Sequence, residues 1–271
     1  MTGLKNADGR VGPAGMENLP KLVEMLCLER GLDADVPASP LAQWETFRAL
    51  VNTRPPCSAS EEFLSLQDEL LQGVIAWRGV TDAREVLPAA KDERLALWRG
   101  DITTLRADAI VNAANSQMLG CFVPGHFCID NAIHTFAGVQ LRLECARLMK
   151  AQGHAEPSGA AKATDAFNLP SGHIIHTVGP VVEGSTDDED RALLASCYRS
   201  CLVAANDLGC KTIAFCCIST GVFGFPQEEA APIAVNAVVS WLDEHSGSSF
   251  ERVIFDVFGD EDFALYRELL G

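Results

Sequence analysis

The chain has 271 residues, of which 48% are hydrophobic, and a net charge of −16 at neutral pH. This length suits one large domain or one domain with an appendage. The negative charge argues against a nucleic-acid binder and against a polybasic membrane anchor, because both need a cationic surface. A small phosphate-bearing ligand stays compatible with it, since backbone N–H groups and helix N-termini bind phosphate without Lys or Arg.

Ten cysteines would suit a secreted disulfide scaffold only in a short chain with a signal peptide. The first 20 residues lack the apolar segment of such a signal, and no run of about 18 apolar residues predicts a membrane span. Cys216 and Cys217 are adjacent in an apolar run, which is typical of reduced thiols in a buried strand. We therefore expect a reducing compartment, the cytoplasm or, in a eukaryote, the nucleus.

Residues 1–18 predict a flexible tail, and residues 19–90 predict a helical N-terminal extension. Apolar residues recur there at helical spacing in three stretches, 22–28, 41–51 and 63–74. Gly31 ends the first stretch, Pro55 follows the second, and Ser60 offers an N-cap to the third. The extension shows no β-strand signal, so we interpret it as a small helical cap or an oligomerisation element.

Residues 91–271 alternate between strand and helix patterns. Short apolar runs predict strands at 95–98, 109–111, 173–178, 212–218 and 252–258. Longer periodic stretches predict helices at 129–150, 190–208, 228–244 and 261–270. This alternation predicts an α/β sheet with helices on both faces, in which ligands bind beyond the carboxyl ends of strands. Asn112, Gly179 and Ser219 each lie just past a predicted strand end.

Polar residues follow two of these strands. Asp101, in the turn after the first strand, can accept a hydrogen bond from the exocyclic amine of a nucleotide base, although an Asp there can also simply cap a turn. Asn112 and Asn115 flank two alanines at the end of the second strand. Their amides can bind sugar hydroxyls, and turn-forming asparagine is the alternative.

The segment from Ser219 to Pro226 follows an apolar strand and precedes a helix. Its glycines, Gly221 and Gly224, allow backbone N–H groups to approach an anion closely. The segment is neither a P-loop nor a dinucleotide fingerprint, because the lysine is missing and the glycine spacing differs. Alone it is a weak phosphate-binding signal.

Cys121, His126 and Cys128 place three good zinc ligands within eight positions. Thiolate and imidazole favour zinc over magnesium or calcium. Pro124 and Gly125 between them predict a tight loop that can bring the three side chains together. The alternative is two core thiols and a surface histidine. No local fourth ligand is apparent, and catalytic zinc sites characteristically keep one position open.

Four ordered segments resemble the macrodomain family: Trp98-Arg99-Gly100-Asp101-Ile102-Thr103, Ala109 to Asn115, Ile174 to Pro180, and Ile218 to Gly224. The chain departs from ordinary hydrolytic macrodomains where those have a run of glycines, because it has the Cys-His-Cys loop there. That loop resembles the zinc-dependent macrodomains, whose helical N-terminal extension is echoed by Val51 to Pro56 and Glu61 to Leu64. The resemblance implies a three-layer α/β/α sandwich with a mixed central sheet, at residues 91–271, and a Zn²⁺ ion.

The resemblance also implies a pocket for ADP-ribose. Asp101 would hold the adenine amine beside Ile102, the loop from Ser219 to Phe225 would wrap the diphosphate, and Phe223 would cap the distal ribose. Phe258 is a weaker candidate for stacking on adenine. The full set expected to bind the ligand is Asp101, Ile102, Asn112, Asn115, Ser219, Thr220, Gly221, Val222, Phe223, Gly224 and Phe225.

For catalysis the resemblance points to Asn115, which would fix the distal ribose, and to Asp130, as a base or an orienting group. A helix N-cap is an equally good reading of Asp130. Zinc would either activate a water or polarise a ribose hydroxyl or the leaving group. His134 and His176 are interpreted as structural.

The expected function is hydrolysis of mono-ADP-ribose from modified protein side chains. Two alternatives are a reader that binds ADP-ribose without cleaving it, and a phosphatase acting on ADP-ribose 1″-phosphate. The partners expected by analogy are ADP-ribosylated proteins and a sirtuin-type ADP-ribosyltransferase, with no nucleic acid and no membrane.

Overall fold

The computed structural model describes residues 12–271, which form a six-stranded sheet between two layers of helices, with a helical extension packed alongside. In spatial order the strands are β2 (Leu95–Arg99), β8 (Arg252–Val257), β7 (Thr212–Phe215), β4 (Ala109–Ala114), β6 (His173–Val178) and β5 (Ala161–Asp165). All pairs are parallel except β5 with β6, so the sheet is mixed as expected.

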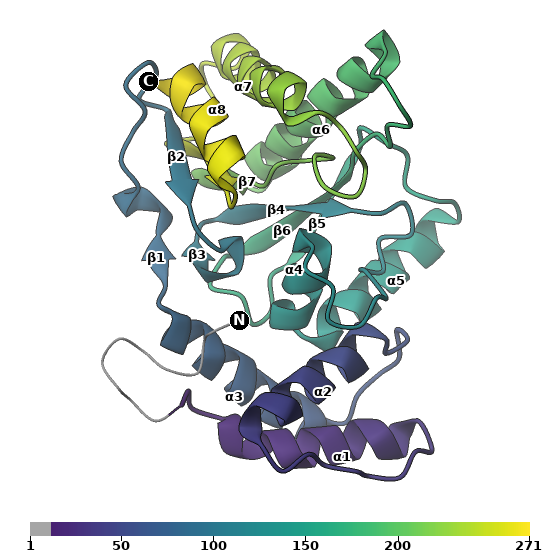
Figure 1. Cartoon of the computed structure of the whole chain (residues 1–271). Coiled ribbons are helices and arrows are strands. Elements are labelled where there is room, and N and C mark those ends of the chain that lie inside the picture. Colours follow the sequence, from purple (N-terminus) through teal and green to yellow (C-terminus); the bar gives the residue numbers. More distant parts are fainter. Residues whose placement is uncertain (1–11) are drawn as a thin grey trace.

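Helices cover both faces of the sheet. They are α4 (Ile129–Ala137), α5 (Val139–Gln152), α6 (Asp188–Asp207), α7 (Gln227–Glu244) and α8 (Asp260–Leu270). Figure 1 shows α6, α7 and α8 above the sheet and α4 and α5 below it. The central strands are buried on both faces, which explains why they are continuous apolar runs rather than alternating ones.

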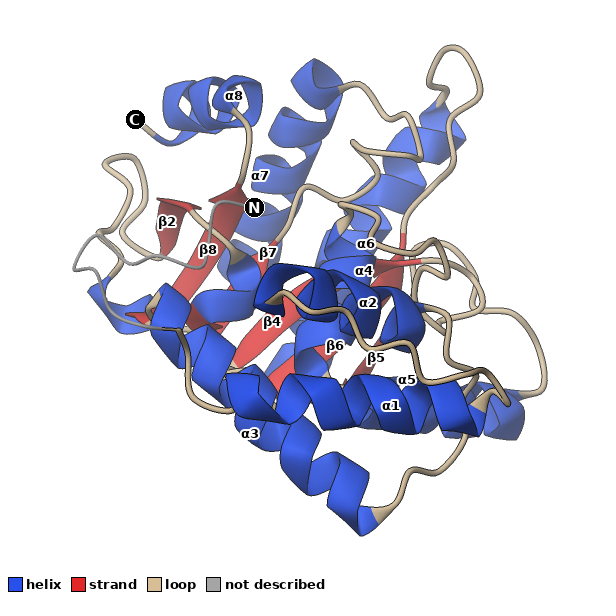
Figure 2. Ribbon diagram, turned by 60° about the horizontal axis from the view of Figure 1, so that its bottom comes forward, coloured by secondary structure: helices blue, strands red, loops and turns tan. Residues whose placement is uncertain are grey.

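The extension consists of η1 (Met16–Asn18), α1 (Leu19–Glu29), α2 (Pro40–Asn52) and α3 (Glu61–Arg78). Ser39 and Ser60 cap α2 and α3 by accepting hydrogen bonds from backbone N–H groups. The three helices enclose a second hydrophobic cluster, which includes Leu22, Phe47 and Leu70. Val139 of α5 belongs to this cluster and Phe136 of α4 packs against it, so the two parts of the chain share a core. Helices α2 and α3 contact α4, and α1 packs on α2 and α3, so the extension lies on the α4 side of the sheet (Figure 2).

The tail predicted for residues 1–18 falls outside the described residues over its first 11 positions. The remaining positions of that predicted tail pack on α3. A Cβ added to Gly15 would lie 2.6 Å from the Leu70 backbone, and one added to Gly73 would lie 2.1 Å from the Ala14 carbonyl oxygen. None of the helices in residues 12–271 has the length and apolar composition needed to cross a lipid bilayer.

Several predicted boundaries were wrong. The single helix expected at 129–150 is two helices separated by Gly138, whose φ of 96° is in the region that favours glycine. The strand β4 continues through Asn112 to Ala114, and β7 ends at Phe215 rather than at residue 218.

Three strands lacked a sequence prediction. They are the edge strand β5 and the short parallel pair β1 (Thr81–Asp82) and β3 (Leu105–Arg106). Since β1 lies at residues 81–82, the extension region contains a short strand after all. Two further 3-10 turns complete the list, η2 (Ala83–Glu85) and η3 (Ile102–Thr104).

Candidate active site

Three neighbouring strands bring the predicted site residues to one edge of the sheet. Strand β4 pairs in parallel with β6 on one side and with β7 on the other, so their carboxyl ends meet. Gly179 directly follows β6, and a Cβ added to it would lie 1.9 Å from the Ser219 hydroxyl oxygen. Asn112 differs from its expected position, because it lies inside β4, opposite His176 and fully buried.

Asn112, Asn115 and Asp130 form one hydrogen-bonded group. The Asn112 amide donates to Oδ1 of Asp130 at 2.8 Å, and the Asn115 amide approaches Oδ2 of the same carboxylate at 3.4 Å. Asn115 also closes its own loop, donating to the Gly120 carbonyl at 3.1 Å and accepting from the Gln117 N–H. The side-chain oxygen of Asn112 is buried and has no partner within residues 12–271.

His176 fixes the orientation of Asn112 from inside the sheet. Its Nδ1 lies 3.1 Å from the Asn112 amide nitrogen, and its Nε2 lies 3.0 Å from the Thr164 hydroxyl. An amide N–H needs an acceptor, so Nδ1 is unprotonated and Nε2 carries the proton. Complete burial lowers the pKa of His176 to about 3, which keeps the ring neutral at physiological pH.

Asp130 is buried beside this network. Burial raises the pKa of Asp130 to about 6, although the hydrogen bond from Asn112, the charge of Arg142 and the hydrogen bond from Asn115 lower it. The N-cap of α4 is not Asp130 but Cys128, whose sulfur accepts from the Asn131 N–H at 3.4 Å. Asp130 is the second residue of the helix, and its side chain faces the asparagines.

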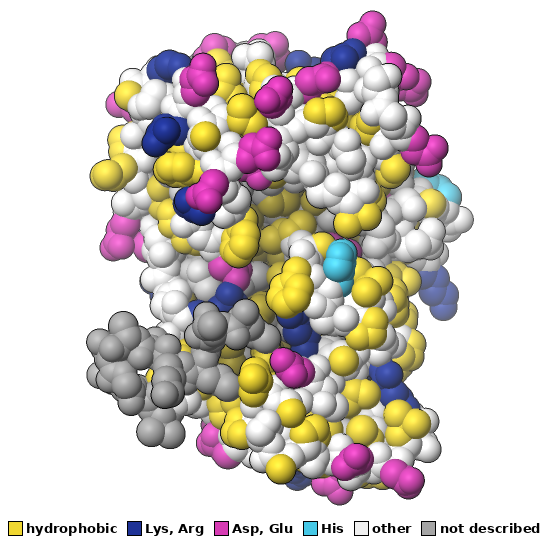
Figure 3. Space-filling model, in the orientation of Figure 1, with side chains coloured by type: hydrophobic (Ala, Val, Ile, Leu, Met, Phe, Trp, Pro, Cys, Tyr) yellow, Lys and Arg dark blue, Asp and Glu magenta, His cyan; other side chains and the backbone are white. Residues whose placement is uncertain are grey.

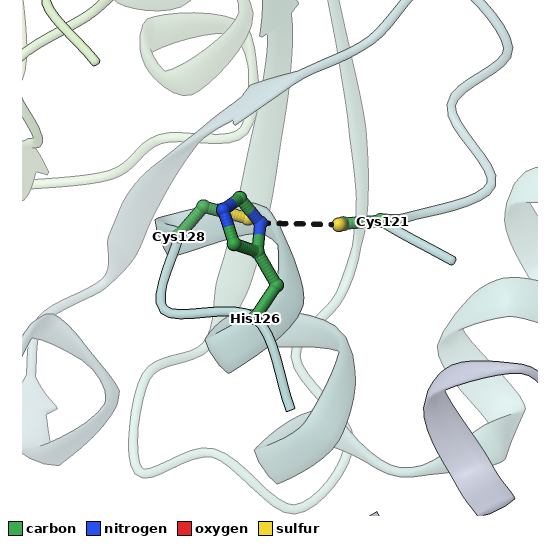
Figure 4. A group of neighbouring side chains, drawn as sticks. All are labelled: Cys121, His126 and Cys128. Atoms are coloured by element: carbon green, nitrogen blue, oxygen red, sulfur yellow. Dashed lines mark hydrogen bonds between the residues drawn. The ribbon is translucent and has the colours of Figure 1, made fainter. Parts of the chain in front are cut away.

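Cys121, His126 and Cys128 converge at the start of α4, as Figure 4 shows. The two sulfurs and one ring nitrogen all lie within 4.8 Å of one another, and Nδ1 of His126 is 3.4 Å from Sγ of Cys121. Ligand atoms around a tetrahedral zinc ion are separated by about 3.5 to 3.8 Å. The three side chains therefore fit a zinc ion with little movement.

The surroundings of the Cys128 thiol make its ionised form unfavourable. Burial raises the pKa of Cys128 to about 11, and the negative charges of Cys121 and Asp130 act in the same direction. A divalent cation between the two sulfurs would remove this penalty, because it stabilises the thiolate form. The donor set and the geometry both fit zinc.

The predicted phosphate loop, Ser219 to Phe225, has an unusual start. Ser219 adopts a φ of 64°, which is uncommon for a residue with a side chain, and its buried hydroxyl has no partner in the described part of the chain. The N–H groups of Gly224 and Phe225 are already bonded to the carbonyls of Gly221 and Ser219, both at 3.0 Å. These two N–H groups are therefore not free to bind an anion.

Four consecutive N–H groups of the loop are available instead. Within residues 12–271, those of Thr220, Gly221, Val222 and Phe223 donate to no other group. The side chain of Phe223 is partly exposed, whereas Phe225 is 1% exposed and belongs to the hydrophobic core. The ring of Phe225 thus anchors the loop to the core.

The base end of the expected site lies at η3. Oδ1 of Asp101 accepts from the Thr103 N–H at 2.9 Å and so caps this turn, while Oδ2 pairs with Arg78 of α3. The Ile102 side chain is 1% exposed and packs in the core. Phe258, at the end of β8, is 80% exposed. The capping role that was one reading of Asp101 is therefore present in the structure.

Figure 3 shows the face of the molecule hollowed at its centre, with hydrophobic side chains in the hollow and a histidine on its rim. Sequence reasoning missed two arginines of the extension, Arg48, which contacts His126, and Arg78, which contacts Asp101, and it missed how His176 orients Asn112. The partners His126 of Arg48, Asp101 of Arg78 and Asn112 of His176 are at least 23 residues away along the chain, so no local pattern signals these contacts.

Comparison with known proteins agrees with this fold. A family model described as the Macro domain matches residues 111–234. A protein-ADP-ribose hydrolase from Treponema medium is 52% identical over 227 residues, which cover 83% of this chain and 86% of that protein. A Fusarium oxysporum f. sp. cubense protein, named a probable bifunctional ADP-ribose hydrolase/ADP-ribosyltransferase, is 48% identical over 83% of this chain and 40% of its own length.

Solved structures give the same result. The Trypanosoma brucei macrodomain in complex with ADP-ribose is 30% identical and matches with a TM-score of 0.64, over 83% of this chain and 95% of that one. The fold, the matched segment and the sequence identity lead to one conclusion. The chain belongs to the macrodomain family.

Proposed function

We propose that the protein is a hydrolase that removes mono-ADP-ribose from modified protein side chains, with zinc assisting at the bond that breaks. The observation that carries the proposal is the position of Asp130. Its buried carboxylate accepts a hydrogen bond from Asn112 and is approached by the Asn115 amide. In the sequence, Asp130 is two residues after Cys128 of the candidate zinc site. The Treponema medium relative, at 52% identity, carries a matching name.

The ligand would extend along the carboxyl edge of the sheet. Asp101 would accept from the adenine amine, and the free N–H groups of Thr220 to Phe223 would bind the diphosphate. Neutral backbone donors suit this chain, because its net charge of −16 leaves few cations to meet the two negative charges of the ligand. Phe223 would then cover the distal ribose, with Asn115 hydrogen-bonded to its hydroxyls.

Asp130 would act on the far side of that ribose. Its Oδ1 is held by the short contact from Asn112, so the more loosely contacted Oδ2 would accept the proton of the attacking water. Zinc bound by Cys121, His126 and Cys128 would supply Lewis-acid polarisation of an oxygen at the reacting bond. Asn112 and His176 would keep the carboxylate in place throughout.

The direct test incubates the purified protein with targets mono-ADP-ribosylated through an acidic-residue ester or through serine. Free ADP-ribose is then measured before chelation, after chelation and after zinc is restored. We expect release that falls on chelation and returns with zinc. Unchanged release after verified zinc removal would refute the role of the metal, and ADP-ribose binding without release from any linkage would identify a reader instead.

We also propose that an ADP-ribosyltransferase supplies the modified substrate, which the bifunctional name of the Fusarium oxysporum relative supports. A sirtuin-type transferase is the form implied by the family resemblance. Because thiolate ligands persist only where thiols stay reduced, we place the reaction in the cytoplasm.

A further inference from the structure

The segment from Leu119 to Cys128, here called the metal loop, has little structure of its own. All ten residues are described, and a single backbone hydrogen bond joins two of them, from the His126 N–H to the Val123 carbonyl at 3.2 Å. Gly125 adopts a φ of 65°, and Phe127 is 80% exposed. A loop with so few internal bonds has much conformational entropy to lose when three side chains must hold one geometry.

Arg48 of α2 contacts the metal loop from the extension. Its Nη2 donates to the His126 carbonyl at 2.8 Å and to Oδ1 of Asn131 at 3.0 Å. Its guanidinium also lies over the Phe127 ring, 5.2 Å from the centroid. Arg48 therefore contacts the backbone of one candidate ligand and the residue that follows it.

Asn131 transmits this contact to the other two candidate ligands. Its amide donates to the Val123 carbonyl at 3.1 Å and to the Cys121 carbonyl at 3.5 Å. Its backbone N–H donates to Sγ of Cys128. Asn131 is fully buried, so water cannot replace the hydrogen bond that its side chain receives from Arg48.

Asn52, one helical turn after Arg48, makes a second connection. Its side-chain oxygen accepts from the Gly125 N–H at 3.1 Å, and its amide donates to the Thr135 hydroxyl at 2.9 Å. The bond to Gly125 fixes the tightest turn of the metal loop, and the bond to Thr135 fixes α2 against α4. Asn52 is 1% exposed, so neither bond competes with bulk water.

We propose that Arg48 and Asn52 are positioning residues for the zinc centre, and that the helical extension holds the metal loop in its metal-binding geometry. The inference rests on the zinc centre of the proposed function. It assigns the extension a role that neither a cap nor an oligomerisation element would have. Partners that orient metal ligands typically affect metal affinity by about 10- to 100-fold.

The test measures zinc affinity of the full chain by competition with a chromophoric chelator, for wild type and for Arg48→Met, Arg48→Lys and Asn52→Ala. We expect Arg48→Met and Asn52→Ala to weaken zinc binding by about 10-fold or more. Arg48→Lys keeps one charged donor and should fall between Arg48→Met and wild type. Amide exchange in zinc-free protein should also be faster at Gly125 in Asn52→Ala than in wild type.

Arg54→Met is the matched control. Arg54 is a buried arginine of the same extension, 3% exposed, but within residues 12–271 its side chain hydrogen-bonds only to Glu29, Cys57 and Ser58. Its loss should lower the melting temperature while zinc affinity stays within about twofold of wild type, so a general loss of stability is separated from a loss of positioning.

Three outcomes distinguish the two proposals. If the wild type binds zinc and the folded Arg48→Met and Asn52→Ala variants bind it equally tightly, the positioning role is wrong and the hydrolase proposal stands. If Arg48→Met does not fold, the zinc affinity of Asn52→Ala and its amide exchange rate at Gly125 decide whether the extension positions the metal loop. If the wild type releases ADP-ribose but binds no zinc, the metal role and this inference fail together.

Discussion

At the scale of single residues, the site depends on the buried Asn112 and on the groups that orient it. Both N–H bonds of the Asn112 amide are used, one by Asp130 and one by His176, and only its oxygen is without a partner in residues 12–271. The spacing of the asparagines was visible in the sequence. The partner that orients Asn112 was not, because His176 is 64 residues away and its ring lies in a neighbouring strand.

Replacing Asp130 separates orientation from proton transfer. In Asp130→Asn the side-chain oxygen can still accept from Asn112, but the group can no longer take a proton. We expect ADP-ribose binding within about threefold of wild type and release slower by about 100-fold. Calorimetric titration and single-turnover kinetics measure the two quantities, with exposed Asp165→Asn as the control. Turnover near the wild-type rate would show that the carboxylate only orients its neighbours.

Asp256 on β8 is a buried carboxyl whose ionised form is unfavourable. Burial and the nearby charge of Asp101 hold the pKa of Asp256 well above its usual value of 3.8, and its Oδ1 has no partner in the described chain. A raised folded-state pKa gives stability that is fully present below pH 3.8 and is lost as the pH rises through the folded-state pKa.

Asp256→Asn should therefore stabilise the protein at pH 7 by about 1 kcal/mol or more. The gain should shrink steadily as the pH falls toward 4, because the carboxyl of the unfolded wild-type chain also becomes protonated there. Urea unfolding of both proteins at a series of pH values measures this difference. A gain independent of pH would show that ionisation of Asp256 is not its cause.

At the scale of elements, the strands that the sequence predicted, β2, β4, β6, β7 and β8, all contain buried apolar residues. The edge strand β5 was missed because Ala161 to Asp165 has few apolar residues and depends on its antiparallel pairing with β6. The break at Gly138 was missed because apolar spacing continues across it. Tertiary contacts set that break, since a Cβ at Gly138 would lie 2.5 Å from Gln140 and 2.7 Å from Gln67.

The junction of β6 with the phosphate loop is similarly close. Because a Cβ at Gly179 would lie 1.9 Å from the Ser219 oxygen, Gly179→Ala must displace the start of that loop. We expect ADP-ribose affinity to fall by about 10-fold with little loss of helical structure, which calorimetry and circular dichroism measure. Gly247→Ala is the control, since a Cβ there meets no atom within 4 Å. Equal affinities of the two variants would contradict the proposed position of the diphosphate.

At the scale of the whole molecule, the extension and the sheet domain are joined by buried hydrogen bonds between them. Arg142 of α5 is 5% exposed and donates to the Val51 and Arg54 carbonyls at 2.9 and 2.6 Å, and to the Leu119 carbonyl at 2.6 Å. The sequence indicated a helical extension, but not this arginine, because its partners are 88 and 91 residues away. A join of this kind resembles a continuous core more than a contact between independent domains.

We therefore expect the chain to unfold in one cooperative transition. Trp44 and Trp77 report on the extension, and Trp98 and Trp241 report on the sheet domain. Variants that keep only one of these pairs, with the other two replaced by phenylalanine, should give coincident urea transitions by fluorescence. An earlier transition for Trp44 and Trp77 would show that the extension unfolds independently.

The packing of α1 has a consequence for residues that touch no ligand. Helix α1 packs against both α2, which contacts the metal loop, and α3, which pairs with Asp101. In the proposed site, the separation between the adenine end and the Asp130 end would then depend on apolar side chains such as Leu22 and Leu26, at 0% and 1% exposure. We therefore expect that enlarging or shrinking either side chain changes the span of the proposed site, so that a helix remote from the ligand would contribute to selectivity for its length.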